Sequence, residues 1–586
     1  MGPRTYRDFR VATPLFIGFL ILWSTFAMAE SASDDDLVKL ARKHFNYDFI
    51  KSQDEQKQLD TFFENVHVGK GTYLGPELEP EDVQKGYLWG PERTVKAEWI
   101  AWVCSDPVAV KMVQSAGIEI RGAKIDGEVE LSWLKMEFPL SASYCYFTGD
   151  INLQGATIRD LGFCGSYLNS GMARNPSASR VLNAGDSKVK GNVNLAKASG
   201  DLIIFENAEI EGRLDCSDAK VEYYFTGNLM KVKGDVNFDF RAVGGIAITR
   251  SSIGGNLRCA VKTFIFHKDR KFHQIGSQIP RGLDASGARI DGDVTVKLDS
   301  SGGTGAWLEY TKIGLGLNLL PCNSPQRGNL DLQDASATGL SNNVKGWPNK
   351  KDLRLKGFVF SELGGDASLD PKVQIKWLRL QSPFVIQQYE QMATVFRNMG
   401  YEAASVEVSI AGKWDEGSET INKDQDTITY AGKHGQIGRL LFANLRLLFY
   451  DLIWFRGFGW LIGYGYRPWN ALFISMSFVL VGWVVFKQAQ MYYILTKKEN
   501  VASKGKDRNF SPFIYSLETF VPLVKLGVAE HWNIEANTVP LKPLQFGPVK
   551  VLYPGVLVLW YYRIHIIAGW VFTSLWVAAF TGILKH

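Results

Sequence analysis

Acidic residues stand close to aromatic residues in the middle of the sequence. Paired carboxylates supply the acid and the base or nucleophile of most glycoside hydrolases, and an aromatic face offers apolar area to a bound ring. This combination would permit cleavage of a glycan. Acids at alternate positions are also typical of the solvated face of a strand, and we favour that interpretation. The group comprises Asp235 with Asp239, Asp291 with Asp293, and Trp307 with Tyr310.

The remaining reactive residues predict neither a metal site nor a cofactor. His267 and His273 could bind a metal ion, but two histidines in this spacing are more often part of a solvated loop. The sequence has no Gly-x-Gly-x-x-Gly motif, no Cys-x-x-Cys-His motif and no iron–sulfur spacing of its six cysteines. We therefore expect no cofactor and assign no catalytic residue.

These residues lie within a repeat that recurs about every 21 to 22 residues or at twice that interval. Each copy has an anchor, which is a glycine in all copies but the last. The residues two before and two after the anchor are apolar, and a polar residue usually follows it, so that each copy alternates like a strand. The anchors are Gly127, Gly149, Gly191, Gly212, Gly234, Gly255, Gly292 and Leu315.

Strands at such short intervals leave no room for crossover helices, so successive copies must stack in parallel by coiling the chain. The repeat predicts a mainly β fold, a right-handed parallel β-helix of residues 115–370. The anchor glycine suits a corner where the backbone bends or adopts positive φ. Small residues four before the anchor suit a narrow interior; they are Ala123, Cys145, Ser187, Ala208, Ser251 and Ala288.

Two cysteines occupy equivalent places in the repeat. Cys216 and Cys259 flank a copy that has Phe238 at the same position. Two strand spacings of about 4.8 Å place their backbones roughly 9 to 10 Å apart, which is beyond disulfide reach. We interpret both as small core residues. The pairing of the other four stays open: Cys104, Cys145, Cys164 and Cys322.

Segments without the repeat flank the β-helix. Residues 1–29 have the basic start, the uncharged run and the small residues of a signal peptide, or form an uncleaved N-terminal anchor. Residues 30–114 and 371–436 show helical runs, namely 34–46, 93–103, 386–399 and 402–414. We expect helical caps there, because an open end would expose unpaired edges and core.

Residues 437–586 have the pattern of a membrane domain. Residues 468–486 and 564–584 are apolar and long enough to span a bilayer, and the second run carries only His565. Residues 440–455 are typical of an interfacial helix. The basic stretch of residues 497–508 follows the first span and predicts a cytoplasmic loop, with the β-helix outside. The expected anchors at the membrane surface are Tyr464, Tyr466, Arg467 and Trp469.

Residues 510–527 are apolar but too interrupted to span a bilayer. We predict a re-entrant or interfacial helix between the two spans, and we favour the interfacial form with Glu518 and Lys525 at its polar edge. The alternative is a segment that lines a pore, as in two-helix channel subunits. The candidate functional residues are Tyr515, Glu518, Pro522 and Lys525.

Several segments carry a resemblance to known proteins: residues 93–98, 102–107, 122–127, 389–393, 463–469 and 513–518. They resemble bacterial membrane-associated proteins with a pentapeptide-like β-helix, and the resemblance covers most of the chain. Such proteins are often labelled membrane-associated oxidoreductases, but the resemblance implies no established reaction and no catalytic residues. Many of them lack a signal peptide, so the start of this sequence departs from their pattern.

Composition narrows the functions further. Hydrophobic residues make up 46% and charged residues 21%, and the net charge of +5 comes without a basic run interleaved with aromatics, which argues against nucleic acid as a partner. We expect a non-enzymatic scaffold of the bacterial envelope, held in the inner membrane with its β-helix in the periplasm. Its expected partners are membrane lipid and an envelope protein or polymer, and self-association is allowed. The alternatives are a channel-like or transport component that uses residues 510–527, and a glycan-acting enzyme on the β-helix face.

Overall fold

The computed structural model describes residues 36–581 except 78, 169–180, 264, 266–281, 298–304, 323–327, 434–436, 450–456, 458, 460–462, 498–509, 522, 538–543, 547–548 and 552–553. The predicted signal peptide, His267, His273 and Pro522 lie outside the described residues. The chain divides into two compact units. The first contains the residues up to Leu369 together with Lys376–Gln388, and the second contains Asp370–Ile375 and the residues from Tyr389 onward.

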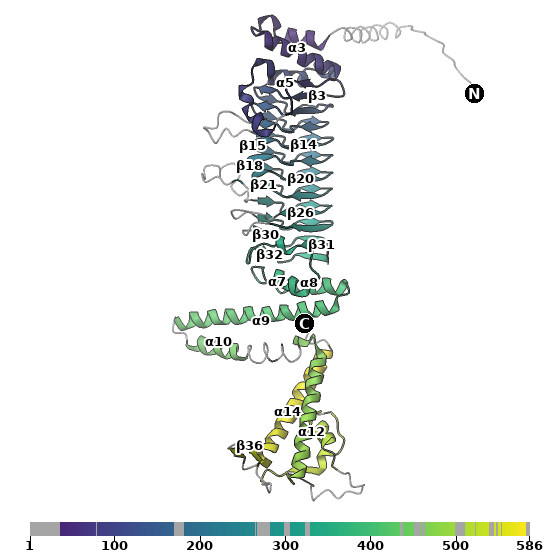
Figure 1. Ribbon diagram of the computed structural model, residues 1–586, viewed down its shortest axis with the longest axis vertical. Helices are drawn as coiled ribbons and strands as arrows, with labels where there is room; N and C mark the ends of the chain where they lie inside the picture. The colour runs from purple at the N-terminus through teal and green to yellow at the C-terminus, as the bar shows by residue number, and fades with distance from the viewer. Residues whose placement is uncertain are drawn as a thin grey trace, which may run out of the picture. The chain divides into compact units, whose positions relative to one another are not determined.

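The first unit is a parallel β-solenoid, as the repeat predicts. Its strands stack coil on coil (Figure 1), and every pairing within its two sheets is parallel among the described residues. Ile210 lies opposite Val232, and Leu214 lies opposite Val236, so equivalent residues of successive copies form columns. The apolar residues two before and two after each anchor are buried, which confirms the predicted core.

One sheet contains the strands on both sides of the anchors: β1 (Thr72–Tyr73), β3 (Ile118–Arg121), β6 (Leu140–Ser143), β9 (Thr157–Ile158), β10 (Leu161–Gly162), β13 (Lys188–Val189), β14 (Val193–Asn194), β16 (Glu209–Ile210), β17 (Leu214–Asp215), β19 (Lys231–Val232), β20 (Val236–Asn237), β22 (Ser252–Ile253), β23 (Leu257–Cys259), β25 (Arg289–Ile290), β26 (Val294–Lys297), β28 (Lys312–Ile313), β29 (Gly316–Leu320), β31 (Ser336–Asn342) and β33 (Val359–Leu363).

The other sheet contains β2 (Thr94–Lys96), β4 (Lys124–Asp126), β5 (Val129–Glu130), β7 (Tyr146–Phe147), β8 (Ile151–Asn152), β11 (Tyr167–Leu168), β12 (Val181–Asn183), β15 (Ser199–Ile204), β18 (Lys220–Thr226), β21 (Ala242–Ala247), β24 (Gly282–Asp284), β27 (Gly305–Trp307), β30 (Asn329–Asp331) and β32 (Leu353–Arg354).

The anchor glycines are needed for close contact between coils. A Cβ on Gly212 would lie 2.5 Å from the carbonyl oxygen of Gly191, and one on Gly234 would lie 2.8 Å from that of Gly212. Among the anchors, only Gly127 has a positive φ. Left-handed residues lie instead at two other corners of the coils, and most of them are not glycine. At these corners the residues other than glycine have φ of 53° to 61°. They include Asp186, Asn207, Leu229, Arg250, Tyr310 and Asp334.

Helices flank the first coils, where the N-terminal cap is predicted. They are α2 (Leu37–His44), α3 (Gln53–Val68), α4 (Pro80–Val83), α5 (Ala97–Ser105) and α6 (Ala109–Met112), with 3-10 turns η1 (Tyr47–Phe49), η2 (Gln84–Leu88) and η3 (Pro91–Arg93). Phe62, Phe63 and Trp99 are buried in the core of this cap. The helix predicted over residues 93–103 is shorter, because Thr94–Lys96 forms β2 and pairs with β4.

Residues after the last strand cover the other end of the solenoid. The amide of Ser382 donates to the carbonyl of Leu353 (2.8 Å), and Gln388 Nε2 donates to the carbonyl of Phe358 (3.2 Å). Trp377 and Leu378 are fully buried. This end also contains η6 (Val344–Gly346), and the chain passes between the two units within α7 (Pro371–Leu378) and α8 (Gln387–Asn398).

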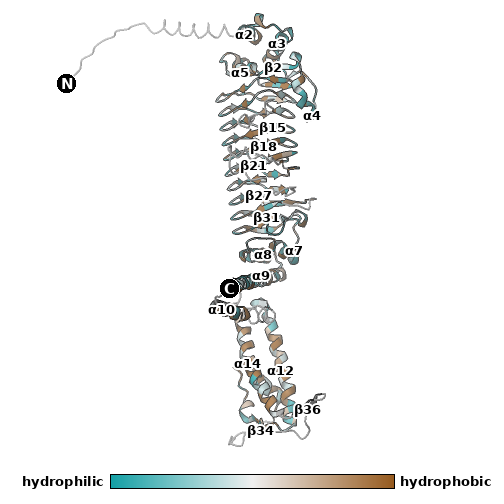
Figure 2. Ribbon diagram, turned by 90° about the vertical axis from the view of Figure 1, so that its left-hand side faces the viewer, coloured by the Kyte–Doolittle hydropathy of each residue, from teal (hydrophilic) through white to brown (hydrophobic). Residues whose placement is uncertain are grey.

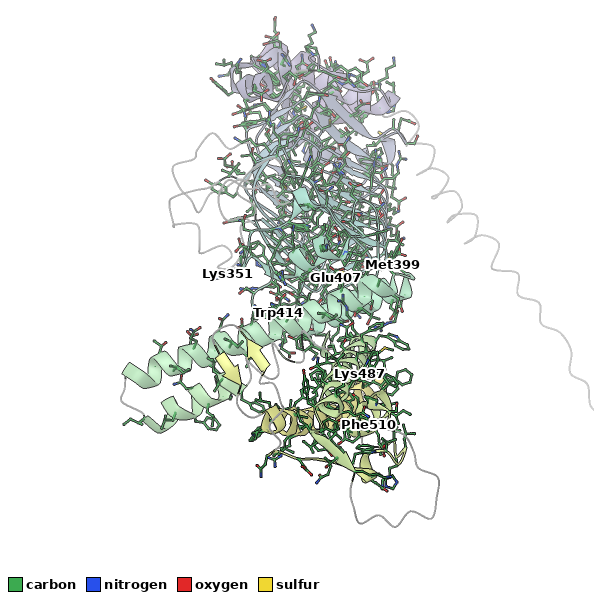
Figure 3. All side chains as sticks on the ribbon, turned by 60° about the horizontal axis from the view of Figure 1, so that its bottom comes forward. Lys351, Met399, Glu407, Trp414, Lys487 and Phe510 are labelled. Atoms are coloured by element: carbon green, nitrogen blue, oxygen red, sulfur yellow. The ribbon has the colours of Figure 1, made fainter. Side chains whose placement is uncertain are left out.

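The second unit continues with a long helix, α9 (Glu402–Lys433), and with α10 (Ile437–Phe449). The helix expected to end at residue 414 runs 19 residues further, since 433 − 414 = 19. Gly412 and Gly417 lie inside α9, where each costs roughly 1 kcal/mol relative to alanine and does not end the helix. The guanidinium of Arg446 on α10 pairs with the buried carboxylate of Asp424 on α9, and Trp414 and Glu407 project from α9 (Figure 3).

Two long apolar helices follow, α12 (Pro468–Met491) and α14 (Pro554–Phe580). By length and composition they could span a membrane, over Trp469–Met491 and Gly555–Ala578, and hydrophobic residues predominate along both (Figure 2). α14 begins ten residues before the predicted span (564 − 554 = 10) and includes Arg563, whose guanidinium lies over the ring of Trp560 at 5.2 Å. The unit also contains η8 (Gly463–Gly465), β34 (Leu495–Lys497), α13 (Pro512–Phe520), η9 (Ala529–His531), β35 (Trp532–Ile534), β36 (Leu544–Phe546) and β37 (Val549–Val551).

Candidate functional site

Three of the four acids predicted as a glycan site, Asp235, Asp239 and Asp293, bond to a neighbouring coil, whereas Asp291 pairs within its own coil. Asp235 Oδ1 accepts the amide of Asn256 (2.7 Å), Asn256 Oδ1 accepts that of Asp293 (2.8 Å), and Asp293 Oδ1 accepts that of Gly316 (2.8 Å). Asp291 Oδ1 is 2.9 Å from Nε of Arg289. Each carboxylate therefore has a bond that its place in the coil explains, which favours the solvated-face interpretation.

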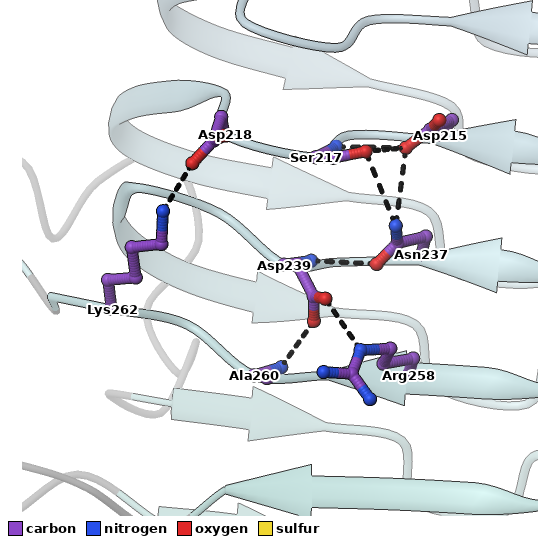
Figure 4. Close-up of polar contacts among 8 residues, drawn as sticks. All are labelled: Asp215, Ser217, Asp218, Asn237, Asp239, Arg258, Ala260 and Lys262. Carbon is purple, nitrogen blue, oxygen red and sulfur yellow. Dashed lines mark hydrogen bonds and ion pairs between the residues drawn. The ribbon is translucent and has the colours of Figure 1, made fainter.

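A second polar column shows the same pattern over three coils (Figure 4). Asp239 accepts the amide of Ala260 (3.0 Å) and pairs with Arg258 Nε (2.6 Å). Asn237, in the same coil as Asp239, donates from Nδ2 to Asp215 Oδ1 of the coil before (3.4 Å). At the corner, the ammonium of Lys262 lowers the pKa of Asp218 by hydrogen bonding to its carboxylate. These contacts explain the acids as links between coils.

Trp307 lies among a different set of acids from those predicted. Its register neighbours in the two adjacent coils are Asp284 and Asp331. Asp331 is buried, and its Oδ2 lies 3.1 Å from Nη1 of Arg354. Burial raises the pKa of the nearby Glu309 carboxyl, and its hydrogen bond with Asp331 and the charge of Asp331 raise it further.

In the second unit, the segment of residues 510–527 forms the short helix α13 and a return loop. Ser511 caps the helix and Pro512 occupies its first turn, where a proline is tolerated. Tyr515 is buried, with its ring 4.9 Å from that of Phe486 on α12. Lys525 is exposed in the loop. The helix within the segment has only nine residues, which agrees with the prediction that the segment does not span a bilayer. It packs on α12 and α14 through apolar contacts, such as that of Phe520 with Phe478.

Glu518 lies at the point where the loop returns to α13. Its carboxylate accepts the amides of Gly527 (2.9 Å), Val528 (2.8 Å) and Ala529 (3.0 Å). Three bonds from successive amides fix the turn, at which Gly527 has a φ of 75°. Glu518 therefore organises the loop, rather than forming the exposed polar edge of a helix.

A contact that the sequence did not predict joins α12, α13 and α14. Ser516 Oγ donates to the carbonyl of Val479 (2.8 Å), and Nε2 of His565 lies 3.1 Å from the carbonyl oxygen of Ser516. Both side chains are fully buried. A Cβ on Gly482 would lie 2.2 Å from Ser516 Oγ, so only glycine lets the helices approach this closely. A neutral imidazole with its proton on Nε2 satisfies this geometry.

The predicted membrane anchors lie at and before the start of α12. Trp469 is 59% exposed on the first turn, and Arg467 is exposed just before the helix. Tyr466 is partly buried. Tyr464 is 5% exposed and sits in the left-handed kink of η8. Trp469 and Arg467 are thus exposed on the surface of the unit, whereas Tyr464 packs inside it.

The six cysteines are all free thiols. None of the six forms a disulfide. Cys216 and Cys259 are buried in the core, as predicted, and burial raises the pKa of both thiols. The described residues include no group of three or more histidine, cysteine or acidic residues that could hold a metal ion.

Comparison with known proteins yields no relative. No protein-family model, no curated protein and no solved structure matches this chain.

Proposed function

We propose that this protein is a membrane-anchored scaffold of the bacterial envelope, whose solenoid presents an extended polar surface to an envelope protein or polymer. The observation that carries the proposal is the apolar surface of α12 and α14. Phe473, Met476, Leu480 and Val484 on α12 are 45% to 65% exposed, as are Leu557, Ile564 and Ile567 on α14. A surface of this kind is stable when lipid covers it.

α10 supports the same placement. Large apolar side chains cover much of its surface and are 55% to 69% exposed: Ile437, Leu441, Phe442, Leu445, Leu448 and Phe449. Its Arg446 is meanwhile paired with Asp424 on α9. An amphipathic helix with an uncovered apolar face is typical of the membrane interface.

The solenoid supports binding rather than catalysis. Its outward acids at Asp235, Asp239 and Asp293 are bonded to the next coil. A stack of coils offers a rigid surface with regularly spaced polar groups, which suits docking. In the proposal, the solenoid faces the periplasm and the basic loop between the two spans faces the cytoplasm.

Alkaline carbonate extraction of bacterial membranes tests the anchor. The wild-type chain should stay with the membrane, and the double variant Leu480→Arg, Val484→Arg should lose membrane insertion, because each arginine costs about 3 kcal/mol at the centre of a span. The matched control is Leu229→Arg, Tyr310→Arg. Both positions are exposed left-handed corners, and Arg250 already occupies such a corner. Release of the wild-type chain by carbonate would contradict the anchor.

A cysteine at Glu206, an exposed solenoid residue, tests the orientation. Five of the six native cysteines are buried, so their background reaction is low. A membrane-impermeant maleimide should label Glu206→Cys in intact spheroplasts, and labelling that needs lysis would place the solenoid in the cytoplasm.

Crosslinking in native membranes followed by purification tests the scaffold. One partner should crosslink to a photoreactive residue in place of Glu206. This crosslinked product should be lost when the outward charges of the same face are reversed. A solenoid that crosslinks to no protein and no polymer would contradict the proposal.

A further inference from the structure

A cavity of about 230 Å³ lies where the N-terminal cap meets the first coils of the solenoid. Its wall comes from the start of α3, the η3 turn, α5, and the neighbouring strands β2 and β4. It is smaller than the ~300–1,000 Å³ of pockets for drug-sized ligands, so it suits one small ring. The lining residues are Ser52, Glu55, Trp89, Gly90, Pro91, Thr94, Lys96, Trp99, Lys124 and Asp126.

Two tryptophans line the cavity, and only Trp89 has side-chain area exposed to it. Trp99 is 1% exposed and belongs to the core of the cap, whereas Trp89 is partly buried. The guanidinium of Arg93 lies over the Trp89 ring at 3.7 Å and donates to the carbonyl of Gly122 from Nη2 (2.7 Å). Trp89 is therefore held in one orientation before any ligand enters, which lowers the entropy cost of binding.

The polar lining is balanced in charge. Lys96 Nζ lies 2.7 Å from Asp126 Oδ2, and this pair is only partly exposed. The ammonium of Lys96 lowers the pKa of Asp126, so this carboxylate is an acceptor at neutral pH. Lys124 and Glu55 add one further cation and one further anion. Two lysines and two acids leave the lining without net charge.

Such a lining matches hydroxyl groups, because a hydroxyl both donates to a carboxylate and accepts from an ammonium. A net charge on the ligand would have no matching net charge in the lining. The flat indole of Trp89 matches the C–H face of a sugar ring. We propose that this cavity binds one neutral sugar ring, either a free monosaccharide or one unit of a polysaccharide.

The cavity lies within the first unit, so sugar binding can be tested independently of the membrane anchor. The full chain, purified in a detergent without a sugar headgroup, is titrated with glucose, galactose, mannose and N-acetylglucosamine, and with a tetrasaccharide of glucose and one of N-acetylglucosamine. Glucuronate and glucosamine serve as charged comparators. Saturation-transfer NMR reports which sugar protons contact the protein, and calorimetry gives the affinity.

At least one neutral sugar should bind, and Trp89→Ala and Lys124→Ala should each weaken it at least tenfold. Trp133→Ala is the matched control, since Trp133 is 69% exposed on a solenoid corner outside the cavity. Thermal melting shows whether Trp89→Ala is folded. If it is not, the loss of binding in Lys124→Ala alone tests the site. A tetrasaccharide that binds tenfold more tightly than its monosaccharide identifies a polysaccharide as the source, and equal affinities identify the free sugar.

Three outcomes overturn the proposal. The first is that no neutral sugar of the panel binds at millimolar concentration. The second is that only glucuronate or glucosamine binds. The third is that Trp133→Ala weakens binding as much as Lys124→Ala does.

Discussion

The solenoid and the membrane-type unit satisfy their polar groups in opposite ways. In the solenoid one kind of bond recurs from coil to coil, as where Asp235, Asn256 and Asp293 each accept an amide of the next coil. In the second unit each polar contact occurs at one place, such as His565 with Ser516 or Glu518 with three amides. A substitution that removes such a contact in the first unit should therefore also affect the neighbouring coils. In the second unit, only substitutions at a few positions should have a large effect.

Removal of a solenoid core ring should have the largest effect. Phe238 is fully buried, and its ring lies 4.8 Å from that of Phe225 and 5.7 Å from that of Phe240. Phe238→Ala should lower the free energy of unfolding by about 4 kcal/mol, from lost burial and the cavity that remains. Chemical denaturation measures the loss. Phe49→Ala is the control, since Phe49 is 85% exposed, and equal losses in both variants would mean that the core column is not the source of stability.

A single methyl group should be nearly as harmful in the second unit. A Cβ on Gly569 would lie 1.8 Å from the carbonyl oxygen of Phe520, which no side-chain rotation can relieve. Gly569→Ala should therefore separate α13 from α14 and cost about 3 kcal/mol. The thermal midpoint of the detergent-solubilised chain reports this loss.

Gly438→Ala is the matched control for Gly569→Ala. Gly438 lies in α10 of the same unit, where an added Cβ meets no atom within 4 Å. The same substitution there should leave the midpoint unchanged or raise it, because alanine favours a helix. If Gly569→Ala is also tolerated, the close approach of these helices is not required.

The difference between the units explains what could be predicted from sequence. The apolar positions recur in every copy of the repeat and the small position in most of them, so the parallel stack and the buried places of Cys216 and Cys259 were predicted correctly. The left-handed corners were not separated from the anchor column, because residues as different as Leu229 and Arg250 occupy them. Stacking of glycine backbones depends on distances between coils, which the repeat does not give.

The second unit was predictable only in outline. Apolar length predicted two helices able to span a membrane. The partners of Ser516, Gly482 and Gly569 lie on helices far away in the sequence, and no repeated spacing marks them. A lone histidine in an apolar run was the one available signal, since such residues in a span usually have a polar partner. The cavity beside Trp89 was also missed, because cap and solenoid residues meet there only in the fold.

The substitution Glu518→Gln tests whether this one side chain organises the return loop after α13. Glu518→Gln removes the charge that three amides share, and it should weaken the turn by about 1.5 kcal/mol, which corresponds to about tenfold faster exchange of the amides of Gly527, Val528 and Ala529. Hydrogen exchange with mass spectrometry measures it. Glu530→Gln is the control, because it removes an exposed acid nearby. If the amides exchange at the wild-type rate in Glu518→Gln, then Glu518 does not stabilise the loop.

The smallest effect concerns the acid pair on the solenoid, and it depends on pH. The pKa of Glu309 is raised by burial and by Asp331, so the folded chain keeps this proton at a pH where the unfolded chain has lost it. Stability therefore falls as the pH rises from the ordinary value of about 4.3 through the raised pKa, and it stays lower above it. Glu309→Gln removes the ionisation and retains a donor for Asp331.

Thermal unfolding of the solenoid should accordingly show no gain for Glu309→Gln at pH 4 and a higher midpoint than wild type at pH 8. Glu206→Gln controls for the loss of one exposed carboxylate. A gain of the same size at both pH values would mean that the glutamine improves packing and that the ionisation of Glu309 does not contribute. A gain at pH 8 alone would show that Glu309 makes a pH-dependent contribution to stability. Even the repetitive unit would then contain a position that differs in this respect from the equivalent positions of other coils.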